Sequence, residues 1–481
     1  MYDWEEEESS HCDGDYDDCH ASLTHDEIAD GGKPTRPLEF PTPIVYQGRL
    51  TSITAFDHRT GVEYHLKNVL ARTGDATTAY LLKKKIAKTA YGFIKLGVVL
   101  KRTPDETNGS LFQAKWQSTE EFVAIKISSW ARIQAMRGRH LEDPIKEISV
   151  LQLIGNGSAA EHHVLGCNEV LQDAEHLYTV MPYCSGGELY SKFDTSSAQM
   201  YPDEEEARRY FGQLTKSLFF LQRKGICHRN LCLDNMLLDA DDNLVLIDSG
   251  LSLRIPYNDP CNMDGVTDVS EGSIRRLMRS QGQCGALMYL APEMLDQRPF
   301  DGHATDLWAA AVTLFVMLVG VAPFSLAQRA DPRFKVITSG GLKDYLQGLG
   351  VSLSPEALDL LQGMLRANPR ERFTLADVMD HPWVLGERFP MENAPAMAPM
   401  ATVFESDLSE GKDEDAASQA TTVDETSDCS TVEHEDNQQI IATAPPKGHR
   451  RKLSEGARDL VGKFKLLLQK KRAPENLRAS V

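Results

Sequence analysis

The residues whose types and spacing could do chemistry lie in two short segments. Residues 228–235 read His-Arg-Asn-Leu-Cys-Leu-Asp-Asn, and Asp248 directly follows the apolar run 244–247. A carboxylate at the end of a buried strand is well placed to bind a metal ion. The side-chain amide of Asn230 can orient a hydroxyl group but is a very poor base. The pattern therefore indicates a metal-binding site with little ability to remove a proton.

Further motifs accompany these segments in a fixed order. They are V-A-I-K at 123–126, D-S-G at 248–250, A-P-E at 291–293, D-L-W at 306–308, P-R-E-R at 369–372 and H-P-W at 381–383. The order resembles that of a eukaryotic protein kinase of the serine/threonine type, and residues 228–235 resemble its catalytic loop H-R-D-L-x-x-x-N. Asn230 stands where that loop has the catalytic Asp. The resemblance also implies that Arg372 pairs with Glu293, the Glu of A-P-E. The resemblance implies an α+β, two-lobed protein kinase fold, with a β-rich N-lobe that carries helix C and a mainly α-helical C-lobe.

The resemblance also implies a complete set of residues for binding magnesium and ATP. Lys126 would hold the α- and β-phosphates, and Glu147, in a helical stretch, would pair with Lys126. Asn235 and Asp248 would hold Mg²⁺. The catalytic residues expected on this basis are Asn230, Lys126, Glu147 and Asp248.

The hinge that would hold adenine is Met181-Pro182-Tyr183-Cys184. The carbonyl oxygen of Pro182 and the N–H of Cys184 would meet the adenine edge, and Glu188 would reach the ribose. Proline is acceptable at this place because only its carbonyl group is needed there.

The glycine-rich loop of the pattern is degenerate. A frame that ends at Gly109 fits poorly, and the better frame covers residues 86–96, with an aromatic Tyr91 before the last glycine. This frame puts a polar insertion near residues 101–119. Its ATP-binding residues would be Ala87, Thr89, Gly92 and Ile94. Because glycine lets backbone N–H groups approach phosphates closely, the two replacements predict a looser hold on the β- and γ-phosphates.

Three further departures concern phosphoryl transfer. Cys232 replaces a Lys that neutralises the γ-phosphate, and Ala286 replaces a Thr that braces the base. Ser249 replaces the Phe of D-F-G, an apolar plug that helps to seat helix C. We therefore expect a serine/threonine kinase-like protein that binds Mg-ATP and whose transfer to protein Ser/Thr is impaired by Asn230. The alternatives are a slow but active kinase and a non-catalytic pseudokinase scaffold that acts by conformation.

Composition limits the partners and the cellular location expected for the protein. The 481 residues carry a net charge of −19, which argues against nucleic-acid binding by the whole chain. Nine cysteines without a C-x-x-C motif favour a reducing compartment. The N-terminus lacks the features of a signal peptide, and the uncharged stretch 307–324 is expected to be a buried kinase helix and not a membrane span. A cytoplasmic protein is expected, with a peripheral membrane or nuclear location left open.

The flanks differ in composition from the kinase-like region 80–385. The segments expected around it are an acidic disordered tail at 1–43, an N-terminal extension at 44–79 that could form a hairpin on the N-lobe, an acidic disordered linker at 386–440 and a basic amphipathic tail at 441–481. Within the last segment, residues 460–471 suit an anionic membrane surface or a calmodulin-like groove. Docking of this stretch on its own kinase domain or on the acidic tail is an equal alternative. The other partner expected is a protein substrate or a signalling protein.

Phosphorylation of Ser454 should weaken binding of the basic tail to anionic lipid. Arg451 lies three residues before Ser454, which suits a basophilic kinase, and each basic residue near an anionic surface contributes about 1 kcal/mol. A peptide of residues 447–472 should co-sediment with anionic vesicles, and its phosphorylated form should do so less. If phosphate makes no difference, or the unmodified peptide does not bind, docking on the kinase domain becomes the better interpretation.

Overall fold

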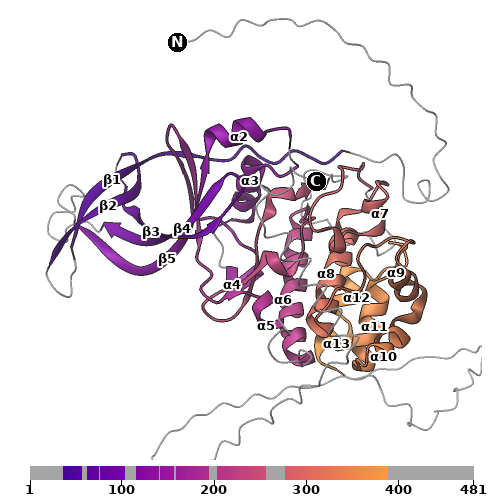
Figure 1. Cartoon of the computed structure of the whole chain (residues 1–481). Coiled ribbons are helices and arrows are strands. Elements are labelled where there is room, and N and C mark those ends of the chain that lie inside the picture. Colours follow the sequence, from indigo (N-terminus) through magenta and orange to yellow (C-terminus); the bar gives the residue numbers. More distant parts are fainter. Residues whose placement is uncertain are drawn as a thin grey trace, which may run out of the picture. The chain divides into compact units, whose positions relative to one another are not determined.

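The computed structural model describes residues 36–56, 62–74, 76–102, 115–139, 141–155, 159–193, 203–255 and 277–387. These residues form a strand-rich N-lobe and a mainly helical C-lobe (Figure 1), so the predicted α+β, two-lobed fold is confirmed. Nearly all of the expected acidic tail, the linker and the basic tail lie outside the described residues, and their boundaries stay predictions.

The elements of the N-lobe are β1 (Tyr46–Phe56), β2 (Glu63–Arg72), β3 (Thr78–Lys88), β4 (Gly92–Arg102), β5 (Trp116–Ser129), α2 (Trp130–Met136), α3 (Pro144–Ile154), α4 (Ala159–His162), β6 (Glu169–Gln172) and β7 (His176–Pro182). The elements of the C-lobe are β8 (Gly187–Glu188), α5 (Tyr190–Phe193), α6 (Glu204–Arg223), β9 (Ile226–Cys227), η1 (Leu233–Asn235), β10 (Met236–Leu238), β11 (Leu244–Leu246), η2 (Ser249–Leu251), β12 (Leu253–Arg254), η4 (Leu287–Tyr289), α7 (Pro292–Leu295), α8 (Gly302–Val319), α9 (Pro332–Val336), η5 (Ile337–Gly341), α10 (Leu342–Gly348), α11 (Pro355–Met364), α12 (Leu375–Met379) and α13 (Pro382–Leu385).

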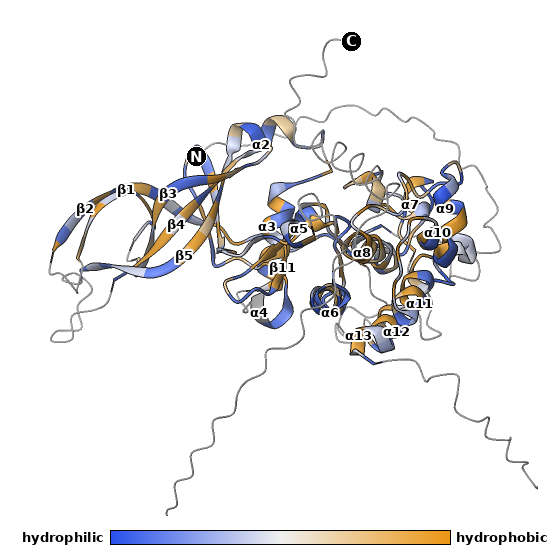
Figure 2. Cartoon of the chain, turned by 60° about the horizontal axis from the view of Figure 1, so that its bottom comes forward, coloured by the Kyte–Doolittle hydropathy of each residue, from blue (hydrophilic) through white to orange (hydrophobic). Residues whose placement is uncertain are grey.

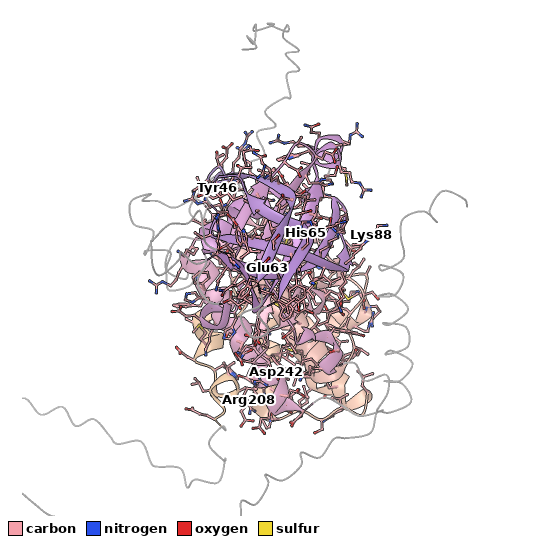
Figure 3. All side chains as sticks on the ribbon, turned by 90° about the vertical axis from the view of Figure 1, so that its left-hand side faces the viewer. Tyr46, Glu63, His65, Lys88, Arg208 and Asp242 are labelled. Atoms are coloured by element: carbon pink, nitrogen blue, oxygen red, sulfur yellow. The ribbon has the colours of Figure 1, made fainter. Side chains whose placement is uncertain are left out.

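The strands of the N-lobe close into a barrel with the order β1-β2-β3-β4-β5-β7-β6. The N-terminal hairpin β1–β2 makes this closure, because β1 runs antiparallel to β2 and also runs parallel to β6, where Tyr46 lies opposite Leu171. The far end of β1 pairs with the start of β5, where Ala55 lies opposite Trp116. Closure removes the exposed strand edges that an open sheet would carry. Figure 3 looks toward these strands, on which Tyr46, Glu63, His65 and Lys88 are marked.

The middle of the barrel wall is buried on both faces. Successive side chains of a strand point to opposite faces. On β2, Leu70 packs with one apolar cluster and its neighbour Val69 packs with another. On β3, Tyr80 and Ala79 divide in the same way. The hairpin β1–β2 therefore gives the N-lobe a second apolar core. This core anchors strands β3 to β5, which carry residues of the candidate site.

The polar insertion predicted near residues 101–119 is narrower than expected. Lys101 and Arg102 still pair within β4, and residues 116–119 already belong to β5. At this end the start of β5 pairs with the far end of β1, and Lys101 of β4 pairs with Thr78 of β3 and with Gln117 of β5. Residues 103–114 lie outside the described part of the chain.

The core of the C-lobe is built around α8, all of whose residues are buried. Figure 2 shows this helix as strongly hydrophobic and surrounded by the other helices of the lobe. Within the described residues, α8 is the one helix long and apolar enough to cross a membrane, and here it lies inside the protein. It begins before the predicted stretch 307–324, because the Asp301 side chain caps the N–H of His303 at 3.0 Å. It ends at Gly320, whose φ of 81° closes the helix.

A buried ion pair joins α7 to the later helices. Arg372 binds Glu293 through two contacts of 3.0 and 3.2 Å, and it also donates to the carbonyl oxygen of Ala304 at 2.7 Å. The pairing of Arg372 with the A-P-E Glu, expected from the kinase resemblance, is therefore present. Such a two-pronged geometry satisfies both charges away from water. Removing one partner of a buried pair typically costs about 3–5 kcal/mol.

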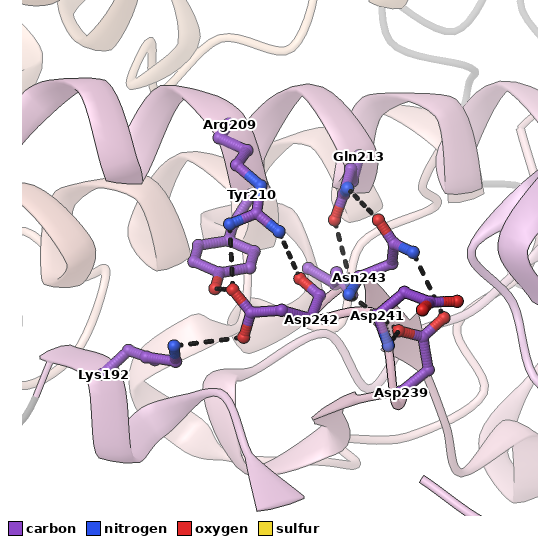
Figure 4. A network of polar contacts seen from close by, with 9 residues as sticks. Lys192, Arg209, Tyr210, Gln213, Asp239, Asp241, Asp242 and Asn243 are labelled. Atoms are coloured by element: carbon purple, nitrogen blue, oxygen red, sulfur yellow. Dashed lines mark hydrogen bonds and ion pairs between the residues drawn. The ribbon is translucent and has the colours of Figure 1, made fainter. Parts of the chain in front are cut away.

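A polar network fastens the β10–β11 hairpin to α6 (Figure 4). On α6, Arg209 and Tyr210 bind the carboxylate of Asp242 in the hairpin turn, at 2.9 and 2.8 Å. One helical turn further on, the Gln213 side chain accepts the N–H of Leu244 at 2.8 Å. The two strands of this hairpin lead directly to the candidate active site, so the network helps to position that site.

Candidate active site

Lys126 and Glu147 form a buried ion pair between the sheet and α3. The distance from Lys126 Nζ to Glu147 Oε2 is 2.5 Å, and the two residues are 9% and 6% exposed. The strand register sets Lys126, because it lies opposite Ile94 on β4 and Thr179 on β7. Burial would lower the pKa of Lys126, but Glu147 and other nearby carboxylates outweigh burial and raise it. The ammonium group therefore stays charged.

The start of α3 is defined by local signals. The side chain of Asp143 accepts the N–H of Ile145 at 2.8 Å, and Pro144 occupies the first helical position. This cap fixes where α3 begins, and so it sets which face of the helix carries Glu147 toward the sheet.

Asn230, Asn235 and Asp248 come together at the ends of η1 and β11. The Asn230 amide donates to Asp248 Oδ2 at 2.8 Å, and the Asn235 amide donates to the backbone oxygen of Asn230 at 2.8 Å. Asp248 has a φ of 67°, in the left-handed region that a non-glycine residue rarely adopts. The three residues thus form one polar cluster.

The cluster fits a magnesium ion that also binds phosphate. Mg²⁺ takes oxygen ligands and is commonly held by one or two carboxylates together with substrate phosphates. Asn235 uses its amide nitrogen internally, which leaves its side-chain oxygen as the group available to a cation. Asp248 adds a carboxylate. No group of three or more His, Cys, Asp or Glu with metal-binding geometry occurs among the described residues, so this pair would depend on a nucleotide to complete the site.

A single carboxylate on α8 binds two backbone N–H groups of the catalytic loop. Asp306 accepts the N–H of His228 at 2.6 Å and the N–H of Arg229 at 2.8 Å. Burial raises the pKa of Asp306 to about 7, while the two N–H groups act in the opposite direction. Arg229 adopts a φ of 63°, which this double contact helps to hold. The sequence indicates Asp306 only as part of the D-L-W motif, although it is the one acidic residue within the apolar α8.

His228 connects the loop to the strand before Asp248. Its Nε2 lies 3.1 Å from the carbonyl oxygen of Ile247, and its Nδ1 accepts the N–H of Asn230 at 3.3 Å. A neutral imidazole that accepts at Nδ1 carries its proton on Nε2. Complete burial lowers the pKa of His228 to about 4, so the ring is neutral. The residue therefore sets the spacing between Asn230 and Asp248.

The turn between β3 and β4 occupies the frame chosen for the glycine-rich loop. Ala87 pairs with Ile94, and the Thr89 hydroxyl accepts the N–H of Gly92 at 3.0 Å. A Cβ on Gly92 would collide with the carbonyl oxygen of Ile127, so only glycine fits there. Paired residues lie on the same face of a sheet, so the side chain of Ile94 lies beside that of Lys126.

The aromatic residue of this turn, Tyr91, is buried, which the sequence did not predict. Tyr91 is only 2% exposed and packs in the apolar cluster that includes Ile133 of α2 and Ile148 of α3. Its hydroxyl donates to the carbonyl oxygen of Glu142 at 2.8 Å. Burial, followed by the negative charges of Glu142 and Asp143, raises the pKa of Tyr91. The turn is thus tied to the segment that leads into α3.

The predicted hinge begins with the last two residues of β7 and continues past the end of the strand. Met181 is buried, and Pro182 ends the strand opposite Val123. Cys184 is partly buried, and burial raises the pKa of its thiol to about 12. Glu188 lies exposed on β8, opposite Leu237 of β10.

The positions that differ from a serine/threonine kinase are packed as parts of the core. Cys232 is 5% exposed, and burial raises the pKa of its thiol to about 12, so no charge is present there. Ser249 is also buried, and Ala286 packs against the C-lobe core. Next to it, Gly285 has a φ of 85° and lies close to Asn230, so that an added Cβ would come within 3.0 Å of Asn230 Oδ1.

The β-rich lobe, the helical lobe and these contacts are the arrangement of a protein kinase domain. A family profile described as "Protein kinase domain" matches residues 107–384. The chain belongs to the protein kinase family. The match begins after the β3–β4 turn, so the frame at residues 86–96 rests on strand pairing and stays a prediction.

Curated relatives include several plant kinases. The chain is 31% identical over 313 residues to "CBL-interacting protein kinase 30" of Oryza sativa subsp. japonica, covering 65% of this chain and 58% of the relative. It is 32% identical over 292 residues to "CBL-interacting protein kinase 1" of the same organism, with 60% and 56% covered. It is 31% identical over 277 residues to "CBL-interacting serine/threonine-protein kinase 15" of Arabidopsis thaliana, with 58% of each covered. The chain thus spans a little over half the length of these relatives.

Replacing His228 by Phe should remove a group that destabilises the folded protein in mild acid. The unfolded imidazole takes up a proton near pH 6.5, whereas the folded one resists until about pH 4. The contribution of His228 to stability therefore falls as pH falls below 6.5. On going from pH 7.5 to 5.8, the unfolding free energy of the wild type should decrease by about 1 kcal/mol relative to that of His228→Phe, measured by denaturant titration.

The comparison between the two proteins is needed because Asp306 titrates in the same range with the opposite sign. Its raised pKa favours the folded state as pH falls, and this contribution is common to both proteins. An equal pH dependence in wild type and His228→Phe would contradict a buried neutral histidine.

Proposed function

We propose that this protein is a serine/threonine protein kinase-like protein that binds Mg-ATP and transfers phosphate to protein Ser/Thr only weakly. The observation that carries the nucleotide-binding half is the buried Lys126–Glu147 pair at 2.5 Å. A lysine held in this way presents a fixed positive charge for the α- and β-phosphates.

The magnesium half of the proposal is supported by the cluster of Asn235 and Asp248 described above. Mg²⁺ bound there with ATP would neutralise the negative charge of the phosphates during transfer. The residues of the chain would do the rest: Lys126 would orient the phosphates, and Asn230 would orient an acceptor hydroxyl through its side-chain oxygen.

The weak transfer is supported by what this cluster lacks. Asn230 has no basic oxygen at neutral pH, and loss of a general base typically lowers a rate by about 10²–10⁴-fold. Cys232 is buried and uncharged, so the cation expected beside the γ-phosphate is missing at this position. Phosphoryl transfer depends chiefly on positioning and charge neutralisation, so residual turnover is compatible with this set.

The serine/threonine assignment draws on the motif order and on the relatives, one of which carries serine/threonine in its name. The CBL interaction in the names of the relatives belongs to those proteins. Two other functions remain as alternatives to weak transfer. A slow but active kinase is favoured by the intact Lys126–Glu147 pair, and a scaffold that acts by conformation is favoured by Asn230.

Mg-ATP at millimolar concentration should raise the unfolding temperature of the full chain. A ligand that binds only the folded state at 100 times its Kd stabilises by about 2.7 kcal/mol. The shift should shrink in Lys126→Ala, each variant being compared with its own ligand-free sample because the substitution also leaves Glu147 unpaired. Absence of a shift in the wild type, confirmed by calorimetry, would leave the scaffold without nucleotide.

Asn230→Asp should increase phosphotransfer to a general Ser/Thr substrate, because it supplies a carboxylate base of nearly the same shape. The increase should be modest while Cys232 and Ala286 remain, since residues that act together in catalysis are not additive. Radiolabelled ATP and purified protein measure this directly, with Asp248→Asn as a negative control. Robust wild-type turnover that Asn230→Asp does not raise would contradict the proposed impairment.

A further inference from the structure

The hydrogen bond between Asn230 and Asp248 is a contact that the expected Asp at position 230 could not make. The Asn230 amide donates to Asp248 Oδ2 at 2.8 Å, whereas a carboxylate has no hydrogen to donate at neutral pH. The substitution that removes the base therefore adds a donor, and this donor is directed at the residue proposed to bind magnesium.

The position of Asn230 is fixed by two contacts of its backbone. Its backbone oxygen accepts from the Asn235 amide at 2.8 Å, and its N–H donates to His228 Nδ1 at 3.3 Å. Its side-chain oxygen lies against Gly285, where an added Cβ would approach within 3.0 Å. With the oxygen on that side, the amide nitrogen is directed toward Asp248.

Asp248 needs such a partner, because its backbone is in an uncommon conformation. Its φ and ψ are 67° and 66°, in the left-handed region. Among the residues that the structure describes, the Asn230 amide is the one hydrogen-bond donor to its carboxylate. The next charge acting on it is the ammonium group of Lys126, whose own contact is with Glu147.

We infer that Asn230 is a positioning residue that holds Asp248 in its metal-binding orientation in the absence of a metal ion. The inference builds on the proposed magnesium site and adds to it. With Asp at position 230, two carboxylates would face each other at hydrogen-bond distance and repel in a partly buried site. A cation between them would then be required to keep the arrangement. The amide removes that requirement and makes the geometry of the site independent of the metal.

The same contact should weaken cation binding. The Asn230 N–H occupies one lone pair of Asp248 Oδ2, and an amide brings no charge to a cation, whereas a second carboxylate would. With Asn230, the geometry of the site is therefore formed before a metal ion binds. An Asp at this position would bind the ion more tightly and would also supply a base.

Unfolding temperatures of the full chain without nucleotide test the inference. The proteins are the wild type, Asn230→Asp, Asn230→Ala and the exchanged pair, in which Asn230→Asp is combined with Asp248→Asn. Each is measured with EDTA and with 10 mM Mg²⁺. In EDTA, Asn230→Ala should unfold below the wild type because the donor is lost, and Asn230→Asp lower still, by about 3 °C or more. Mg²⁺ should raise Asn230→Asp by more than it raises the wild type or Asn230→Ala.

The exchanged pair is the matched control, because it restores one donor and one acceptor in reverse order. It should recover most of the stability that Asn230→Asp loses in EDTA. The inference is overturned if Asn230→Asp matches the wild type in EDTA, if Mg²⁺ raises all variants equally, or if the exchanged pair is as unstable as Asn230→Asp. Because no nucleotide is present, failure of ATP binding leaves this result unaffected. Circular dichroism spectra of each variant verify that the compared proteins are folded.

Discussion

The candidate site depends on one buried carboxylate. Asp306 of α8 holds two consecutive N–H groups of the catalytic loop, those of His228 and Arg229. His228 in turn contacts the carbonyl oxygen of Ile247, and Asn230 donates a hydrogen bond to Asp248. Asp306 is almost completely buried, so its carboxylate needs hydrogen-bond donors from the protein, and these two N–H groups supply them. The interior of the C-lobe thus dictates the geometry of the loop.

The N-lobe reaches the same site by a different constraint. Lys126 lies on a strand with neighbours on both sides, so a slip of one residue would turn its side chain to the opposite face. The hairpin β1–β2 strengthens this register by closing the sheet into a barrel and burying both faces of its middle strands. The turn at Tyr91 then ties the sheet to the entry of α3, which carries Glu147. Sheet, turn and helix therefore hold the Lys126–Glu147 pair jointly.

The two halves of the site differ in how far they depart from the kinase pattern. The groups that would bind phosphate and metal keep their charges and their mutual contacts. The groups that would move a proton or neutralise the transferred phosphate are replaced by an amide and a buried thiol, at Asn230 and Cys232. These replacements are compatible with the fold, since Asn230 makes three hydrogen bonds and Cys232 packs in the C-lobe core. The replacements therefore change the charges at the site and leave its packing intact.

The sequence by itself determined the family and the two-lobed fold, because motifs such as V-A-I-K and A-P-E occur in the fixed order of a protein kinase. The residues of the candidate site are predictions from the same motifs, and the sequence also indicated the pairing of Arg372 with Glu293. Only the tertiary structure decided what depends on long-range pairing. The closure of the barrel by β1, the inward position of Tyr91 and the role of Asp306 each involve partners far apart in the chain. The direction of the Asn230 amide was likewise invisible in the sequence, because His228 and Asn235 hold the backbone of Asn230 and its side chain lies between Gly285 and Asp248.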